Sequence, residues 1–236
     1  MSPLTQIEAD ALILSLEVGL WSVLICLPTG LTLALVLARL SFPGKWLLDA
    51  VIHLPLVLPP VVIGYVLLVV LGRQGPVGAW LEDSFGIILA FNWKGAAIAA
   101  ALMALPLMVR AIRLSLETLD RGIEDAARTL GAGTVRVFLT ITLPLILPGL
   151  LTGGILAFAR SLGEFGATIT FVSNIPGVTQ TLPLALFSET QVPGDGTPAL
   201  RLTAIAILVA LTALAASEYL SRRVQKTVSG ELEVTR

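Results

Sequence analysis

The feature that most constrains this chain is a series of long segments that contain almost no charged residues. A helix needs about 20 mostly apolar residues to cross the hydrocarbon core of a membrane. Only 13% of the 236 residues are charged and 56% are hydrophobic, whereas about 25% of a soluble domain is charged. This composition excludes a soluble globular domain and also a disordered chain. We therefore expect an all-α membrane protein with about five transmembrane helices, the apolar segments being 18–38, 50–72, 84–109, 137–159 and 202–217.

The basic residues indicate which side each loop lies on, because Lys and Arg concentrate on the cytoplasmic side. With five spans and the N-terminus outside, four of the 15 basic residues lie outside, and the other 11 (15 − 4) lie inside. The four outer ones are Arg73, Lys94, Arg160 and Arg201. We therefore expect a multi-pass membrane protein with its N-terminus outside and its C-terminus inside. We expect one transmembrane domain over 1–236, with spans at roughly 11–39, 46–71, 85–112, 136–160 and 200–221 and a cytoplasmic helix at about 121–131.

A sixth apolar segment, 165–188, contains Asn174, Pro176 and Pro183. These residues interrupt a helix and add polar groups that lipid does not satisfy. A sixth full crossing would also move the basic pair Arg222 and Arg223 to the outside. The segment is therefore predicted to be a short or re-entrant element packed inside the protein.

Proline and small residues mark two of the spans. Pro59 and Pro60 in the second span predict a kink. Proline is common in membrane helices, but the kink could also form a hinge or gap along a passage. In the fourth span, Gly149, Gly153 and Ala157 predict close packing against another helix.

The longest cytoplasmic loop contains the most regular pattern. Asp120 is placed to cap a helix that has Glu124 and Asp125 in its first turns, and Gly131 and Gly133 are placed to end it. One interpretation is an amphipathic helix at the membrane surface that only fixes the loop. The other is a small-residue surface on which a partner protein docks.

The wider pattern favours the docking surface. Ala126 and Ala127 are followed by three residues, Gly131, nine residues and then Ile-Thr-Leu-Pro at 141–144. This resembles the signature loop of ABC importer permeases, which reads E-A-A, three residues, G, nine residues, I-x-L-P. The sequence departs from the signature at one place, because Asp125 directly precedes Ala126 and Glu124 stands one residue further back. Which of the two carboxylates takes the signature role stays open.

The resemblance implies a type I ABC importer permease fold with no catalytic site of its own. It also implies that the single domain is a permease of the cytoplasmic (inner) membrane of a prokaryote. It implies that the cytoplasmic helix is a coupling helix, which a separate ATPase subunit moves so that the spans alternate between inward and outward access. ATP and Mg would be bound by that partner, and this chain would hold no cofactor or metal. The coupling residues implied are Glu124, Asp125, Ala126, Ala127, Arg128 and Gly131.

The outer end of the fourth span carries a second candidate site. Arg160 and Glu164 are four residues apart on one helical face and are expected to pair. The pair could be purely structural. Charges at membrane depth are also functional candidates, and the hydroxyl and backbone donors here suit a transient oxyanion. The candidate path or gate residues are Ser161, Gly163, Glu164, Phe165, Gly166, Pro59 and Pro60.

Resemblance also indicates the substrate. The stretches 53–65, 159–168 and 174–183 look like those of molybdate transporter permeases, while sulfate and thiosulfate permeases share a similar element around 163–166. Molybdate is therefore expected, with sulfate, thiosulfate or tungstate as the alternatives. The implied partners are a second copy of this chain, two ABC ATPase subunits, a periplasmic or extracellular molybdate-binding protein and membrane lipid.

The sequence gives little support to other classes of function. The chain has no phosphate-binding G-x-x-x-x-G-K-[ST] motif of its own. One histidine and one cysteine offer little for an intramembrane hydrolase. An ion-coupled secondary transporter would ordinarily show two repeats, and no repeat is visible. The basic residues form no long run, so no nucleic-acid partner is expected.

Overall fold

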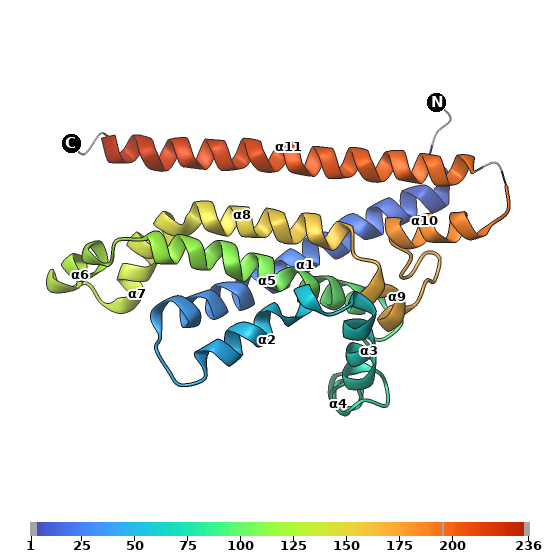
Figure 1. The fold of residues 1–236 in the computed structure, drawn as a ribbon, viewed down its shortest axis with the longest axis horizontal. Helices are drawn as coiled ribbons and strands as arrows, with labels where there is room; N and C mark the ends of the chain where they lie inside the picture. Colours follow the sequence, from blue (N-terminus) through green and yellow to red (C-terminus); the bar gives the residue numbers. More distant parts are fainter. Residues whose placement is uncertain (1–3, 195, 234–236) are drawn as a thin grey trace.

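A computed structural model describes residues 4–194 and 196–233, with side chains described as far as Ala216 and at Tyr219. The described part is built of helices and contains no strand, which confirms the all-α prediction. Figure 1 shows long helices lying side by side along one axis, with the short helices α6 and α7 at one end and α9 and α10 at the other. Glu218 and Arg222 stand four residues apart near the end of the fifth span, a spacing that predicts an ion pair on one helical face; both lie outside the described side chains.

Four stretches are long and apolar enough to cross a membrane, and a bent pair of shorter helices forms a fifth. The four are α1 (Gln6–Arg39), α5 (Trp93–Thr118), the continuous stretch Thr134–Leu162, and α11 (Thr197–Glu233), in which the membrane-length part is Thr197–Ala216. The stretch Thr134–Leu162 comprises α7 (Thr134–Val137), the π-helix η1 (Phe138–Thr142) and α8 (Leu143–Leu162).

The second span differs from a single helix over 46–71. It consists of α2 (Lys45–Val57) and α3 (Pro60–Leu71), which are bent by 113° relative to each other. The bend follows from the two prolines, because Pro60 begins α3 and neither proline has an N–H to continue the hydrogen bonds of α2. The interruption is therefore a full break rather than a kink.

The third span also begins later than position 85. Residues Pro76–Phe85 form a separate helix, α4, which Gly86 ends in the left-handed conformation with φ of 66°. The α5 helix starts only after Asn92, whose side chain accepts a hydrogen bond from the Lys94 N–H. The apolar residues between α4 and α5 therefore form a loop, and α5 extends to Thr118 instead of 112.

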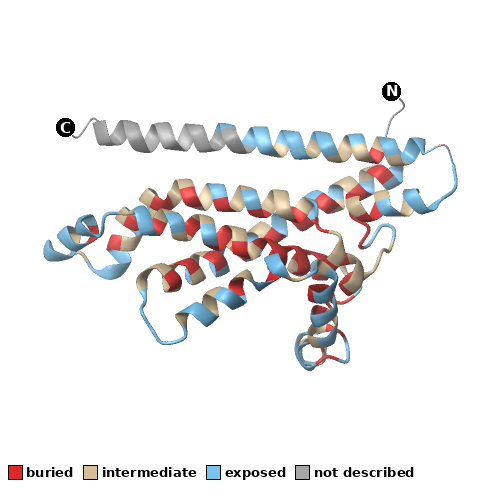
Figure 2. Cartoon of the chain, viewed as in Figure 1, coloured by how far each residue is buried: buried red, intermediate tan, exposed pale blue. Residues whose placement is uncertain are grey.

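The core forms where α5 packs between α1 and α8. Figure 2 shows buried residues concentrated on these helices, whereas the described part of α11 is mostly exposed. Small residues permit the close approach. A Cβ on Gly149 would overlap the Ser115 hydroxyl, and one on Gly153 would lie 3.1 Å from the Met108 sulfur. The predicted close packing of the fourth span is thus confirmed at Gly149 and Gly153 and at Ala157, which is fully buried.

Segment 165–188 contains two short helices, α9 (Gly166–Val172) and α10 (Leu182–Gln191), neither of them long enough to cross a membrane. Hydrogen bonds among polar side chains fix the loop between them: the Asn174 amide donates to Ser188 Oγ at 2.7 Å, and the Gln180 amide donates to Asn174 Oδ1 at 3.0 Å. Leu182 and Leu184 pack into the interior. The segment is therefore a short element packed within the protein, as predicted.

Candidate coupling helix and outer gate

The coupling-helix candidate is α6 (Arg121–Thr129), which lies at the same end of the molecule as the last turn of α1 (Figure 1). Asp120 caps it by accepting a hydrogen bond from the Gly122 N–H at 2.8 Å. Gly131 follows the helix with φ of 88°, a conformation that glycine adopts without steric cost. Gly133 does not end α6 but precedes α7. The local sequence thus defines both ends of a short rigid element.

The two adjacent carboxylates of α6 face different environments. The side chain of Glu124 is 6% exposed, and its Oε1 accepts hydrogen bonds from Arg39 at 2.7 Å and from the Thr142 hydroxyl at 2.6 Å. The side chain of Asp125 is 68% exposed and pairs with Arg128 at 2.7 Å. The structure therefore directs Glu124 toward its own chain and Asp125 toward the solvent.

The exposed surface of α6 and of the residue after it carries apolar side chains beside the charged ones. Ala126 is exposed and Ala127 is half-buried. Ile123 is 47% exposed, and Leu130 is 89% exposed. A cavity of about 700 Å³ is lined by residues of α6, α7 and the end of α1, among them Arg39, Arg121 and Arg128. This end of the molecule combines exposed apolar side chains with charges, as a protein-docking surface does.

The outer candidate site is built around Glu164, whose side chain is 2% exposed. Its Oε1 accepts a hydrogen bond from the Ala167 N–H at 2.8 Å, in the first turn of α9. Its Oε2 lies 2.7 Å from Arg160 Nη1, an ion pair without the alignment of a hydrogen bond. The predicted Arg160–Glu164 pair is therefore present, and it also connects α8 to α9.

The structure brings several of the other gate candidates together. A Cβ on Gly166 would lie 2.8 Å from Pro60 Cβ, so the start of α9 contacts the break between α2 and α3, where Pro59 and Pro60 lie. Phe165 packs against Phe187 of α10 with ring centroids 5.1 Å apart. A Cβ on Gly163 would meet nothing within 4 Å.

Ser161 is a gate candidate that does not join these contacts. It is buried between α1 and α8, where its hydroxyl lies 2.5 Å from the hydroxyl of Ser22 and also donates to the carbonyl of Ala157. The Ser161 hydroxyl is thus engaged in the contact between α1 and α8.

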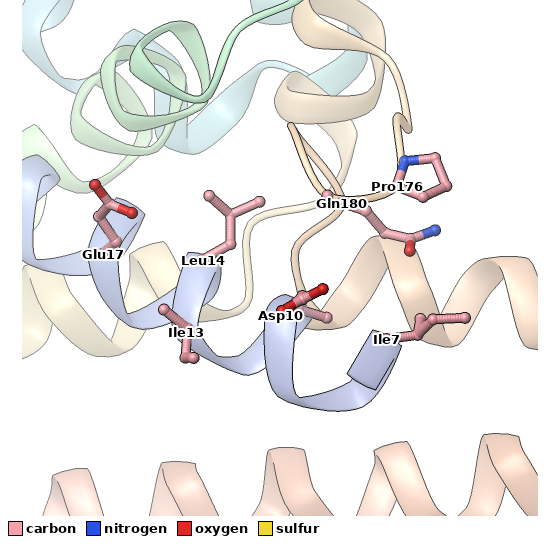
Figure 3. Close-up of a pocket in the computed structure, with 9 residues that line it drawn as sticks. Ile7, Asp10, Ile13, Leu14, Glu17, Pro176 and Gln180 are labelled. Carbon is pink, nitrogen blue, oxygen red and sulfur yellow. The ribbon is translucent and has the colours of Figure 1, made fainter. Parts of the chain in front are cut away.

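A pocket of about 330 Å³ opens between α1 and the loop before α10 (Figure 3). Asp10 and Glu17 on α1 line one side of it, and Pro176 and Gln180 of the loop before α10 line the other. Its two carboxylates would repel an oxyanion at neutral pH. Within the described residues, no cluster of His, Cys, Asp and Glu could hold a metal ion.

Comparison with known proteins assigns the chain to a family. Residues 28–226 match the family described as "Binding-protein-dependent transport system inner membrane component". The chain belongs to this family. It is 60% identical over 219 residues to the "Molybdenum transport system permease protein ModB" of Escherichia coli K12, an alignment that covers 93% of this chain and 96% of the relative. The Haemophilus influenzae protein of the same name is 58% identical over the same shares.

More distant relatives of this permease include a "Probable sulfate transport system permease protein cysT" from Chlorokybus atmophyticus, 38% identical over 75% of this chain and 62% of that protein. Among solved structures, a bacterial ABC transporter "involved in the import of the acidic polysaccharide alginate" superposes with a TM-score of 0.74 at 16% identity, over 93% of this chain and 80% of that one. The permease therefore has the type I ABC importer permease fold.

Three residues of this permease that contact the candidate sites were missed in the sequence: Arg39, Thr142 and Ser22. Arg39 and Ser22 precede their partners by 85 and 139 residues, so no local pattern indicates these contacts. Thr142 stands at the variable x position of the I-x-L-P element, where the signature sets no residue type. Only the folded arrangement reveals them.

Proposed function

We propose that this chain is the membrane-spanning subunit of an ATP-driven importer of molybdate. The observation that carries the proposal is the 60% identity to a molybdenum transport permease over nearly the full length of both proteins. The sulfate permease relative is much less similar, at 38% over a smaller share. The anion would cross between the spans, while this chain itself carries out no chemical reaction.

The driving force would come from separate ATPase subunits that bind ATP and Mg. The exposed surface of α6, with Ala126, Leu130 and the Asp125–Arg128 pair, supports docking of such a partner. Charges that flank an apolar contact determine how the two proteins align more than they raise the affinity between them. Two ATPases would act on two copies of α6, so the permease would work as a homodimer.

Exposed apolar residues of α3 support the homodimer. Val61, Tyr65 and Val69 are 53%, 61% and 52% exposed. In an oligomer, such a face at membrane depth packs against a second subunit or lipid. Because α3 also contacts α9 through Gly64 and Ala167, a movement between subunits would reach the Glu164 region directly. We propose that this region, together with Pro59 and Pro60, forms the outer gate.

The orientation follows from the basic residues. We propose that the N-terminus and the α9–α10 segment face outward, where a substrate-binding protein delivers the anion, and that α6 faces the cytoplasm. A passage must also release its cargo, so tight binding would belong to the delivering protein. The acidic pocket between α1 and the loop before α10 lies at this outer end.

The test is to identify the anion that stimulates ATP hydrolysis by the reconstituted complex. The permease, its ATPase and its binding protein are placed in proteoliposomes, and ATP hydrolysis is measured with molybdate, tungstate or sulfate. Molybdate is expected to stimulate hydrolysis and to accumulate inside the vesicles, and vanadate is expected to stop both. Stimulation by sulfate alone would contradict the assigned substrate. Uptake by vesicles that contain the permease without an ATPase would indicate a secondary transporter.

A further inference from the structure

The carboxylate of Glu124 joins three elements that lie far apart in the sequence. Its Oε1 accepts one hydrogen bond from Arg39 at the end of α1 and another from Thr142 at the end of η1. The residues Arg39, Glu124 and Thr142 are called here the Glu124 cluster. Arg121 reinforces the same junction, because its guanidinium donates to the carbonyl of Ala38 at 3.1 Å. The α6 helix is therefore attached to the cytoplasmic ends of two spans.

The π-helix contributes to this geometry. Residues Phe138–Thr142 form one π-helical stretch between α7 and α8, within an otherwise continuous helix. Short π-helical stretches are rare and occur frequently at functional sites. Thr142 is the last residue of this stretch and is 4% exposed. The widened turn thus ends at the hydroxyl that contacts Glu124.

The two spans held by the Glu124 cluster also pack against each other directly. Ser22 in the middle of α1 and Ser161 near the end of α8 are hydrogen-bonded at 2.5 Å. Three residues beyond Ser161 is Glu164, which connects α8 to α9. A displacement of α6 would therefore move α1 and α8 as one unit and would reach the outer site.

We infer that the Glu124 cluster holds α6 rigidly on α1 and α8, so that movement of a docked partner reaches the spans, while Asp125 is the carboxylate that faces the partner. This inference rests on the proposed function. Arg39, Glu124 and Thr142 are positioning residues, since they act through α6. The two acidic residues before Ala126 therefore have separate roles. Glu124 transmits movement within the chain, and Asp125 aligns the docked partner on α6.

The inference is tested in the reconstituted complex by the number of molybdate ions moved per ATP hydrolysed. The variants are Glu124→Gln, which removes one charge at nearly constant shape, and Thr142→Val, which removes the hydroxyl. Each is expected to keep the ATPase bound but to lower the molybdate moved per ATP about tenfold, since each weakens a hydrogen bond to a charged group. Asp125→Asn is expected instead to reduce the amount of ATPase that co-purifies.

Glu117→Gln is the matched control, because Glu117 pairs with Arg113 on the same helix, α5, at 2.7 Å and is 47% exposed. This variant is expected to leave the number of molybdate ions moved per ATP unchanged. The charge exchange Arg39→Glu with Glu124→Arg is expected to recover more transport than either single change.

Two results would overturn the inference. One is a wild-type ratio in both Glu124→Gln and Thr142→Val, and the other is loss of the bound ATPase in Glu124→Gln. A wild-type complex that moves no molybdate would instead count against the proposed function.

Discussion

Glu164 shows how one side chain can serve two elements. One carboxylate oxygen caps the first turn of α9, and the other pairs with Arg160 of α8. Burial of a charged group is costly unless it is paired and hydrogen-bonded, and Glu164 has both kinds of partner. The side chain therefore fixes the angle between α8 and α9 at the point where α9 meets Pro60.

We predict that Glu164→Gln lowers both molybdate uptake and the thermal stability of the complex. Glutamine can still accept from Ala167 but loses the charge that faces Arg160. The loss is expected to be about 1–2 kcal/mol, reduced from the value for a fully buried pair because Arg160 is 27% exposed. Uptake into proteoliposomes and the melting midpoint of the purified complex measure the two effects.

The matched control is Glu82→Gln, which removes the same charge from a more exposed pair, Arg73–Glu82 at 3.3 Å. This variant should behave as the wild type. Undiminished uptake in Glu164→Gln would exclude the gate role.

At the scale of the element, the geometry of α6 depends on how its C-terminal end is formed. Gly131 has a positive φ, and a Cβ added to it would meet nothing within 4 Å. A substitution there is therefore opposed by backbone conformation alone and not by crowding. Asparagine tolerates the left-handed region better than β-branched residues do.

We predict a graded effect at this position: Gly131→Val impairs transport strongly and Gly131→Asn mildly. Valine in the left-handed conformation costs about 1–2 kcal/mol, which favours a different exit from α6 and displaces its docking surface. ATP-dependent molybdate uptake, compared at equal amounts of assembled complex, measures the difference. Gly133→Ala is the control, since Gly133 has an ordinary φ of −69° and equal free space. Equal uptake by the valine and asparagine variants would show that the conformation of Gly131 does not matter.

The sequence predicted the elements better than the contacts between them. Runs without charges identify apolar segments, and Asp120 and Gly131 define α6, because those signals are local. The break at Pro59 was underestimated, since proline within a span usually only bends it. The start of α5 was placed too early because the apolar residues 86–92 resemble part of a span by composition while forming a loop. The partners of Glu124 depend on tertiary packing that no local pattern encodes.

At the scale of the whole molecule, the long axis of the bundle separates two chemically different ends. One end carries α6, α7 and the terminus of α1, and the other carries α9, α10 and the start of α1 (Figure 1). Arg201 of α11 pairs with the buried Glu8 of α1 at 2.9 Å and so closes the second end. In the proposed orientation, which rests on the distribution of the basic residues, α6 faces the cytoplasm.

We predict that cysteine labelling in intact cells will reveal this orientation. The single native cysteine, Cys26, is 1% exposed and is first replaced by alanine. A cysteine at Gln191, the exposed last residue of α10, should react with a membrane-impermeant maleimide in intact cells. A cysteine at Ser41, exposed in the loop after α1, should react only once the membrane is permeabilised. The reverse pattern would invert the proposed topology.

The exposed Leu130 has a consequence for how the complex is made. Together with Ile123, it presents an exposed apolar surface, which the proposed orientation places at the cytoplasmic end. Patches of this kind promote aggregation when they stay uncovered in water. A permease subunit synthesised without enough ATPase would therefore be a target for self-association and proteolysis. The surface that transmits force in the finished transporter would thus also make balanced synthesis of the two subunits a requirement.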